Sequence, residues 1–310
     1  MCGRTWLLRA GSGLWVTEVS LFLIRASIVK QEAQLTGRLG QLHGWLWCGD
    51  KPPVGAVIMV HGLGDHGGRY RKLAESIVTR GWCVYAFDLP GHGRSPGGRG
   101  RVDSFRGLLG DIEAACQTIA DRFHGLPQVL LGYSMGGNLV LNYLLRCLED
   151  GRSPSIKPDG VVLCAPMLLP PAPPPRPHIF AAWMTGYLMP WIQIERPVDV
   201  DSLTGDVDQA EMIANDPWVH SRITLYLATQ LLSQGRWALD HARSIDVPAL
   251  IMFGEDDRLI DRSACEHLAI RAGELATLIR WPHRRHDLFH DTDRETVFGG
   301  VSDWLQQCFD

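Results

Sequence analysis

Residues 129–139 read Val-Leu-Leu-Gly-Tyr-Ser-Met-Gly-Gly-Asn-Leu, and this stretch decides the predicted fold. Its first residues form an apolar strand, and the residues from Met135 onward are typical of a helix. Gly132 and Gly136 flank Ser134 in a Gly-x-Ser-x-Gly turn, where the absence of a Cβ lets the backbone bend sharply. Because such a strand–turn–helix unit lifts the serine hydroxyl above the end of a sheet, Ser134 is the candidate nucleophile.

A second Gly-x-Ser-x-Gly match surrounds Ser95 at residues 93–97. The residue after a serine nucleophile must donate its backbone N–H to the oxyanion of the substrate, and Pro96 has no N–H. Met135, which follows Ser134, has one. No apolar strand precedes Ser95 and no helical pattern follows it, so we interpret this match as a glycine-rich loop.

Short apolar runs alternate with helical stretches along most of the chain. This order predicts an α/β protein with a mostly parallel central sheet and flanking helices. Residues 34–38 and 41–47 alternate in polarity around Gly40 and predict an antiparallel hairpin at the edge of the sheet. The expected buried strands are 56–60, 83–87, 129–131, 161–164, 249–253 and 277–281, and the expected helices are 71–80, 105–123, 135–148, 263–272 and 295–309.

The interval between the strands 161–164 and 249–253 is too long for a single crossover. We therefore predict one domain over residues 34–310, with an insertion at about residues 167–240 that begins with a proline-rich run at 168–177. The insertion contains several aromatic and aliphatic segments. Two interpretations remain open, because these segments can pack together as a small core or form a lid whose apolar face covers an acyl chain.

Composition excludes several classes of protein. Hydrophobic residues make up 45% of the 310 residues, which supports a large core and excludes a disordered chain. The net charge of −4 gives no basic field for nucleic acid, so nucleic acid is not an expected partner.

Residues 6–29 are mostly apolar, but Arg9, Glu18 and Arg25 interrupt them, so no uncharged stretch is long enough for a membrane-spanning helix. Residues 1–33 are expected to be an amphipathic or disordered extension.

Eight cysteines are scattered along the chain without any Cys-x-x-Cys spacing. Several lie inside apolar strand runs. They are interpreted as small buried hydrophobic residues in a reducing compartment rather than as a disulfide framework. The expected location is therefore cytoplasmic, with at most a peripheral contact with a membrane. The cysteines are Cys2, Cys48, Cys83, Cys116, Cys147, Cys164, Cys265 and Cys308.

A serine hydroxyl becomes a good nucleophile only when a histidine accepts its proton and a carboxylate orients that histidine. In the predicted fold, these partners follow in the order serine, acid, histidine. Candidate side chains come directly after two of the expected strands, and position alone does not choose among them. The candidate acids are Glu255, Asp256, Asp257 and Asp261, and the candidate bases are His283, His286 and His290.

Residues 61–68 read His-Gly-Leu-Gly-Asp-His-Gly-Gly and follow the expected strand 56–60. Their four glycines allow the backbone to approach a substrate carbonyl closely. We predict that the N–H groups of Leu63 and Met135 form the oxyanion hole. His61 precedes the serine and is expected to brace this loop, and Asp88 is expected to accept N–H bonds from a neighbouring glycine loop.

Three motifs together resemble the monoacylglycerol lipase and lysophospholipase family of α/β-hydrolases. They are residues 61–70, residues 88–95 (Asp-Leu-Pro-Gly-His-Gly-Arg-Ser) and residues 132–137, and the resemblance covers about residues 35–305. It implies that Asp257 is the acid and His286 the base. The run Asn215-Asp216-Pro217 resembles a run often found in the lid region of this family. Many members have histidine at the position of Tyr133, and the proline-rich run has no recognised counterpart.

These motifs and the resemblance predict a serine hydrolase that cleaves carboxylic esters of lipids. In this prediction Ser134, His286 and Asp257 form the catalytic triad, and neither a metal nor an organic cofactor is required. A lipid ester is the expected partner, and the lid is expected to contact a membrane surface transiently. The alternatives are a hydrolase of short soluble esters, thioesters or peptides, and a binding protein that has lost the reaction.

Overall fold

The computed structural model describes residues 28–148, 156–172, 174–195, 197 and 199–309. An eight-stranded sheet forms the centre, in the order β1-β2-β4-β3-β5-β6-β9-β10. β1 and β2 pair antiparallel, β2 pairs antiparallel with β4, and the remaining neighbours pair in parallel. The strands are β1 (Val29–Gly37), β2 (Gly40–Cys48), β3 (Gly55–Val60), β4 (Trp82–Phe87), β5 (Gln128–Tyr133), β6 (Gly160–Cys164), β9 (Ala249–Gly254) and β10 (Ala276–Trp281).

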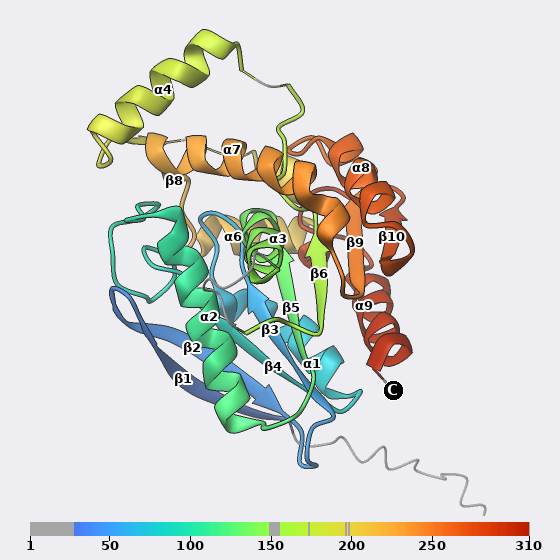
Figure 1. Cartoon of the computed structure of the whole chain (residues 1–310). Coiled ribbons are helices and arrows are strands. Elements are labelled where there is room, and N and C mark those ends of the chain that lie inside the picture. Colours follow the sequence, from blue (N-terminus) through green and yellow to red (C-terminus); the bar gives the residue numbers. More distant parts are fainter. Residues whose placement is uncertain (1–27, 149–155, 173, 196, 198, 310) are drawn as a thin grey trace, which may run out of the picture.

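Helices cover both faces of this sheet (Figure 1). α2 and α3 lie side by side over one face, whereas α1 contacts α9 on the other. Because both faces are covered, the central strands are apolar at nearly every position, and every residue of β3 and β4 is buried. The helices are α1 (Arg71–Val78), α2 (Phe105–Arg122), α3 (Met135–Cys147), α8 (Arg262–Ala272) and α9 (Arg294–Phe309).

The segment between β6 and β9 crosses above the carboxyl ends of the strands (Figure 1). α7 lies next to the sheet and contacts α3, and α4 packs on the outer side of α7. β7, which follows α4, pairs with β8, which precedes α7, in a short two-stranded sheet. The elements are α4 (Arg176–Leu188), β7 (Gln193–Glu195), α5 (Val200–Leu203), α6 (Val207–Asn215), β8 (Arg222–Thr224) and α7 (Leu225–His241).

The predicted fold is confirmed. Each of the six apolar runs is a strand, and each predicted helix is present within two residues of its expected ends. The predicted burial is wrong for 277–281, because β10 is an edge strand and is only partly buried. The predicted hairpin is present, with its turn at residues 38–39 directly before Gly40. β1 begins at Val29, five residues before the expected start, and the first 27 residues of the predicted extension lie outside the described residues. None of the helices in the described part of the chain is long and apolar enough to cross a membrane.

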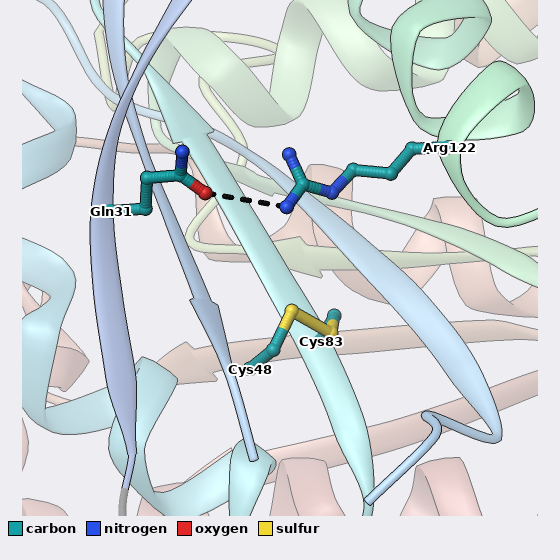
Figure 2. Close-up of a disulfide and its surroundings, with 4 residues drawn as sticks. All are labelled: Gln31, Cys48, Cys83 and Arg122. Carbon is teal, nitrogen blue, oxygen red and sulfur yellow. Dashed lines mark hydrogen bonds between the residues drawn. A yellow bond between two sulfur atoms is a disulfide. The ribbon is translucent and has the colours of Figure 1, made fainter. Parts of the chain in front are cut away.

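The prediction of reduced cysteines is wrong for one pair. Cys48 and Cys83 form a disulfide between β2 and β4, with their Cα atoms 4.6 Å apart (Figure 2). Trp47 pairs with Val84 in the antiparallel register, so one residue forward in β2 and one residue back in β4 places Cys48 opposite Cys83. Spacing rules look for cysteines close in sequence, whereas this pair is 35 residues apart and is brought together by strand pairing.

The other cysteines in the described residues form no disulfide. Cys116, Cys164 and Cys265 are buried as predicted, Cys147 is partly buried and Cys308 is exposed. Cys2 lies outside the described residues. On the side of the sheet where α2 packs, Arg122 donates a hydrogen bond of 3.3 Å to Gln31 of β1, so the edge hairpin is also joined to a helix (Figure 2).

Candidate active site

Ser134 occupies the tight turn between β5 and α3. Its φ is +53°, a left-handed value that is rare for residues other than glycine. The two flanking glycines leave no room for a side chain, because a Cβ on Gly132 would lie 2.4 Å from the carbonyl oxygen of Gly136, and one on Gly136 would lie 2.0 Å from that of Val60. The predicted elbow glycines are therefore required by close backbone packing.

The structure brings Ser134, His286 and Asp257 together in one hydrogen-bonded chain. His286 Nε2 lies 2.9 Å from Ser134 Oγ, and its Nδ1 lies 2.7 Å from Asp257 Oδ2. A carboxylate only accepts, so Nδ1 carries the hydrogen and Nε2 is left to accept the serine proton. The other carboxylate oxygen accepts the Leu259 N–H at 2.8 Å, which fixes its orientation. All three side chains are buried.

The other candidate acids and bases lie elsewhere. Glu255 and Asp256 are exposed, and Asp261 caps α8 by accepting the Ser263 N–H. Among the histidines, His283 is exposed, and His290 lies against Asp287 at 2.9 Å. Among these candidates, the pair that the resemblance implies, Asp257 and His286, is joined by a hydrogen bond of 2.7 Å.

Two opposing effects set the pKa of His286. Burial alone lowers the pKa, because the imidazolium is poorly solvated in the interior. The Asp257 carboxylate acts in the opposite direction through its charge and its hydrogen bond, and Asp287 adds to this effect. The net pKa of His286 is raised above its ordinary value.

The predicted oxyanion loop packs directly on the elbow. A Cβ on Gly62 would lie 3.3 Å from the Cβ of Ser134. Within the described residues, the backbone N–H groups of Leu63 and Met135 have no hydrogen-bond acceptor, so both are available to a substrate oxygen. His61 braces this loop as expected, because its Nδ1 lies 2.7 Å from the Gly62 carbonyl and its Nε2 accepts the Leu89 N–H.

Asp88 and Ser95 hold loops in place beside the site. The Asp88 carboxylate accepts the N–H groups of Gly67 and Arg94, each at 2.8 Å, as predicted for a structural role. Ser95 Oγ donates to the carbonyl of Asp88 and accepts the N–H of His43, and no histidine ring in the described residues hydrogen-bonds to it. The second Gly-x-Ser-x-Gly match is a loop.

The insertion is bound to the oxyanion loop at residues 216–224. Asp216 lies 2.9 Å from His66 Nε2, and the His220 N–H donates to the Gly64 carbonyl at 2.9 Å. The Thr224 N–H donates to Gly100 in the same way. A Cβ on Gly64 would lie 1.8 Å from the carbonyl oxygen of His220, so only glycine fits this contact.

Sequence reasoning missed a group of charged residues next to the site. Arg69 lies between Asp65 and Asp287, at 2.8 and 3.0 Å, and thereby joins the oxyanion loop to the loop of His286. Two signals were present, since Asp287 follows the candidate base directly and Arg69 belongs to the 61–70 motif. In the described part of the chain, no cluster of three or more His, Cys, Asp or Glu side chains is arranged to hold a metal ion.

This fold and site define an α/β-hydrolase, with the serine elbow after β5, the acid after β9 and the histidine after β10. The protein family described as "Serine aminopeptidase, S33" matches residues 51–293, and the chain belongs to this family.

Two of the similar proteins are bacterial. The monoacylglycerol lipase of Mycolicibacterium smegmatis is 29% identical over 268 residues, which cover 84% of this chain and 91% of the relative. Phospholipase YtpA of Bacillus subtilis is 26% identical over 269 residues, which cover 85% and 99%. The crystal structure of Paleococcus ferrophilus monoacylglycerol lipase is 27% identical and has a TM-score of 0.75, with coverage of 91% of this chain and 99% of that one.

The predicted resemblance is confirmed by these comparisons. The chain is a serine ester hydrolase of the α/β-hydrolase fold, similar to monoacylglycerol lipases.

Proposed function

We propose that this enzyme hydrolyses a lipid with a single ester-linked acyl chain, a monoacylglycerol or a lysophospholipid, with Ser134, His286 and Asp257 as its triad. The observation that carries the proposal is the buried hydrogen-bonded chain Ser134–His286–Asp257 beside the two available N–H groups. The names of the bacterial relatives support the choice of a lipid substrate.

In the proposed reaction, Ser134 Oγ attacks the ester carbonyl while His286 Nε2 accepts its proton. Asp257 stabilises the imidazolium, and the N–H groups of Leu63 and Met135 bind the oxyanion. The C–O bond to glycerol or to the lysophospholipid head group then breaks, and the leaving oxygen takes the proton from His286. Water attacks the acyl-enzyme in the same manner and releases the fatty acid and free Ser134.

A lipid substrate is also supported by the apolar surface of α4 and the loop after it. Phe180, Trp183 and Tyr187 stack along one side of α4, with ring centroids 6.1 and 6.0 Å apart, and all three are exposed. Leu188 and Trp191 extend this surface and are also exposed. Few soluble proteins expose aromatic residues at this density, and the proposed role is transient contact with a lipid surface.

A mostly apolar cavity of about 540 Å³ lies between α4, α7 and the segment after β6. Leu169, Ile179, Trp183 and Leu232 are among its lining residues. Its volume falls in the range of small-molecule sites, and we propose that it receives the acyl chain.

The cytoplasmic location stays a prediction, and the Cys48–Cys83 disulfide favours an oxidising compartment instead. Trapping thiols with an alkylating agent at the moment of cell lysis, followed by peptide mapping, distinguishes the two.

The proposed function is tested on a panel of monoacylglycerols, lysophospholipids and triacylglycerols of varied chain length, with an aminoacyl p-nitroanilide to represent the peptidase alternative. Ser134→Ala is expected to abolish turnover and labelling by a fluorophosphonate probe, whereas the control variant Ser95→Ala should still be labelled by the probe. Activity confined to short soluble esters or to the anilide, or labelling that survives in Ser134→Ala, would contradict the proposal.

A further inference from the structure

A buried chain of charges connects the loop of Leu63 with the loop of His286. Arg69 Nη1 lies 2.8 Å from Asp65 Oδ1, and its Nη2 lies 3.0 Å from Asp287 Oδ2. The Arg69 side chain is 12% exposed and that of Asp287 is 1% exposed, so this pairing takes place away from solvent. Asp287 is the residue directly after the proposed base.

Other polar atoms of this cluster also have partners. Asp65 accepts the His66 N–H at 2.7 Å and the Tyr70 hydroxyl at 2.5 Å. His290 Nδ1 lies 2.9 Å from Asp287 Oδ1, and its Nε2 lies 3.0 Å from the Arg69 carbonyl. A buried ion pair with this many satisfied atoms is costly to break from one side, because the other charge is left without a partner.

Both carboxylates remain charged at neutral pH. Burial alone would raise the pKa of Asp65, but the Arg69 guanidinium acts together with His61, His66 and His290, and their combined effect holds the pKa below its ordinary value. Burial acts in the same direction on Asp287, where His290 and Arg69 lower the pKa. The cluster is therefore an ionic bridge across two loops rather than a set of neutral hydrogen bonds.

We propose that Arg69, Asp65 and Asp287 form a positioning clasp that holds the loop of His286 against the oxyanion loop. This proposal rests on the proposed function, because it treats His286 as the base. Proton transfer requires His286 and the oxyanion N–H groups to act on one substrate atom, and a displacement of about 1 Å can cost a hundredfold in rate. A planar guanidinium bonded to one carboxylate on each loop fixes their separation, which a single ammonium group cannot do as well.

The clasp also acts on His286 electrostatically. The groups that face His286 are Asp257 from the β9 loop, Ser134, the Tyr133 ring at 5.3 Å and Asp287. Those that act on Asp287 are Arg69, His290, Asp65, Tyr70, Tyr133 and Cys164. Asp287 contributes to the raised pKa of His286, so removal of its charge lowers that pKa. Removal of Arg69 leaves the negative charge uncompensated and raises it.

The test is the pH dependence of kcat/KM on p-nitrophenyl butyrate. Asp287→Asn is expected to move the acid limb to lower pH, and Arg69→Gln to higher pH, with kcat reduced roughly ten- to a hundredfold in both and KM little changed. Arg69→Lys should keep the wild-type acid limb but only part of the wild-type kcat. Lysine keeps the positive charge, but its ammonium group lacks the planar guanidinium that bonds both carboxylates at once. Arg71→Gln is the matched control, since Arg71 is exposed and pairs with Glu75 on α1. It should behave as wild type.

A purely structural role would lower the melting temperature and kcat in Asp287→Asn and Arg69→Gln without shifting their acid limbs in opposite directions. That result, or shifts in the same direction, would overturn the clasp. An NMR titration of the His286 ring proton in the folded Asp287→Asn variant measures the expected decrease in the His286 pKa directly, without any need for turnover. If Ser134→Ala retains activity, the proposed function fails, whereas the NMR shift still decides whether Asp287 acts on His286.

Discussion

The disulfide between Cys48 and Cys83 is expected to contribute stability without contributing to catalysis. The bond closes a loop of 35 residues. In the chain-entropy treatment, a loop of this length restricts the unfolded state by roughly 3–4 kcal/mol at 25 °C. Cys83 lies at the amino end of β4, whereas the oxyanion loop and Ser134 follow the carboxyl ends of the parallel strands β3 and β5, so the disulfide and Ser134 lie at opposite ends of the strands. Its loss should leave the site geometry unchanged.

The perturbation is the double variant Cys48→Ala and Cys83→Ala, compared with Cys308→Ala, which removes an exposed cysteine that is not in a disulfide. Urea unfolding should give a free energy lower by about 2–4 kcal/mol for the double variant and close to wild type for Cys308→Ala. Activity on a soluble ester at 25 °C should be unchanged in both. The wild-type protein, denatured, should release two more thiols after reduction than before.

Equal thiol counts before and after reduction would refute the disulfide itself. An unchanged unfolding free energy in the double variant would refute the loop-closure reasoning. A large loss of activity in a double variant that remains folded would refute the separation between stability and catalysis.

Three further predictions concern the site and α4. Asp257→Asn should lower kcat by about 10⁴, whereas Asp256→Asn should retain most activity, and the reverse result would move the acid by one residue. Because the pKa of His286 is raised above its ordinary value and the base must be neutral, kcat/KM should fall as pH decreases through that pKa, and an acid limb below the ordinary histidine pKa would contradict this. Replacing Tyr187 and Trp191, which are exposed and do not line the proposed acyl cavity, by serine should weaken binding to phosphatidylcholine vesicles and hydrolysis of dispersed lipid at least severalfold, while turnover of p-nitrophenyl butyrate stays near wild type. Equal losses on both substrates would contradict a role in lipid contact.

The central strands and the elbow were predictable because their signals are local. The parallel strands inside the sheet are buried on both faces and are therefore apolar runs, whereas the edge strand β10 is only partly buried. The turn at Ser134 requires glycine on both sides. The acid was not predictable from position alone, because Glu255, Asp256 and Asp257 are adjacent and only the third points toward His286. The resemblance implied Asp257, and the hydrogen bond between Asp257 and His286 is consistent with that prediction.

The disulfide and the clasp could not be predicted, because both depend on distant residues. Cys48 and Cys83 meet through the register of an antiparallel strand pair. Arg69 and Asp287 are 218 residues apart and meet because the loops after β3 and β10 converge at one end of the sheet. A single sequence contains the members of such pairs but not the register or convergence that joins them.

The contacts of residues 216–224 divide the insertion into two parts with different freedom to move. Lifting this segment would break its hydrogen bonds to Gly64, His66 and Gly100, and with them the support of the oxyanion loop. α4 makes none of these bonds and rests on α7 through largely apolar contacts. Under the proposed function, a lipid that enters from the α4 side leaves the hydrogen bonds of the Leu63 loop intact, and the proposed oxyanion hole need not reassemble in each turnover.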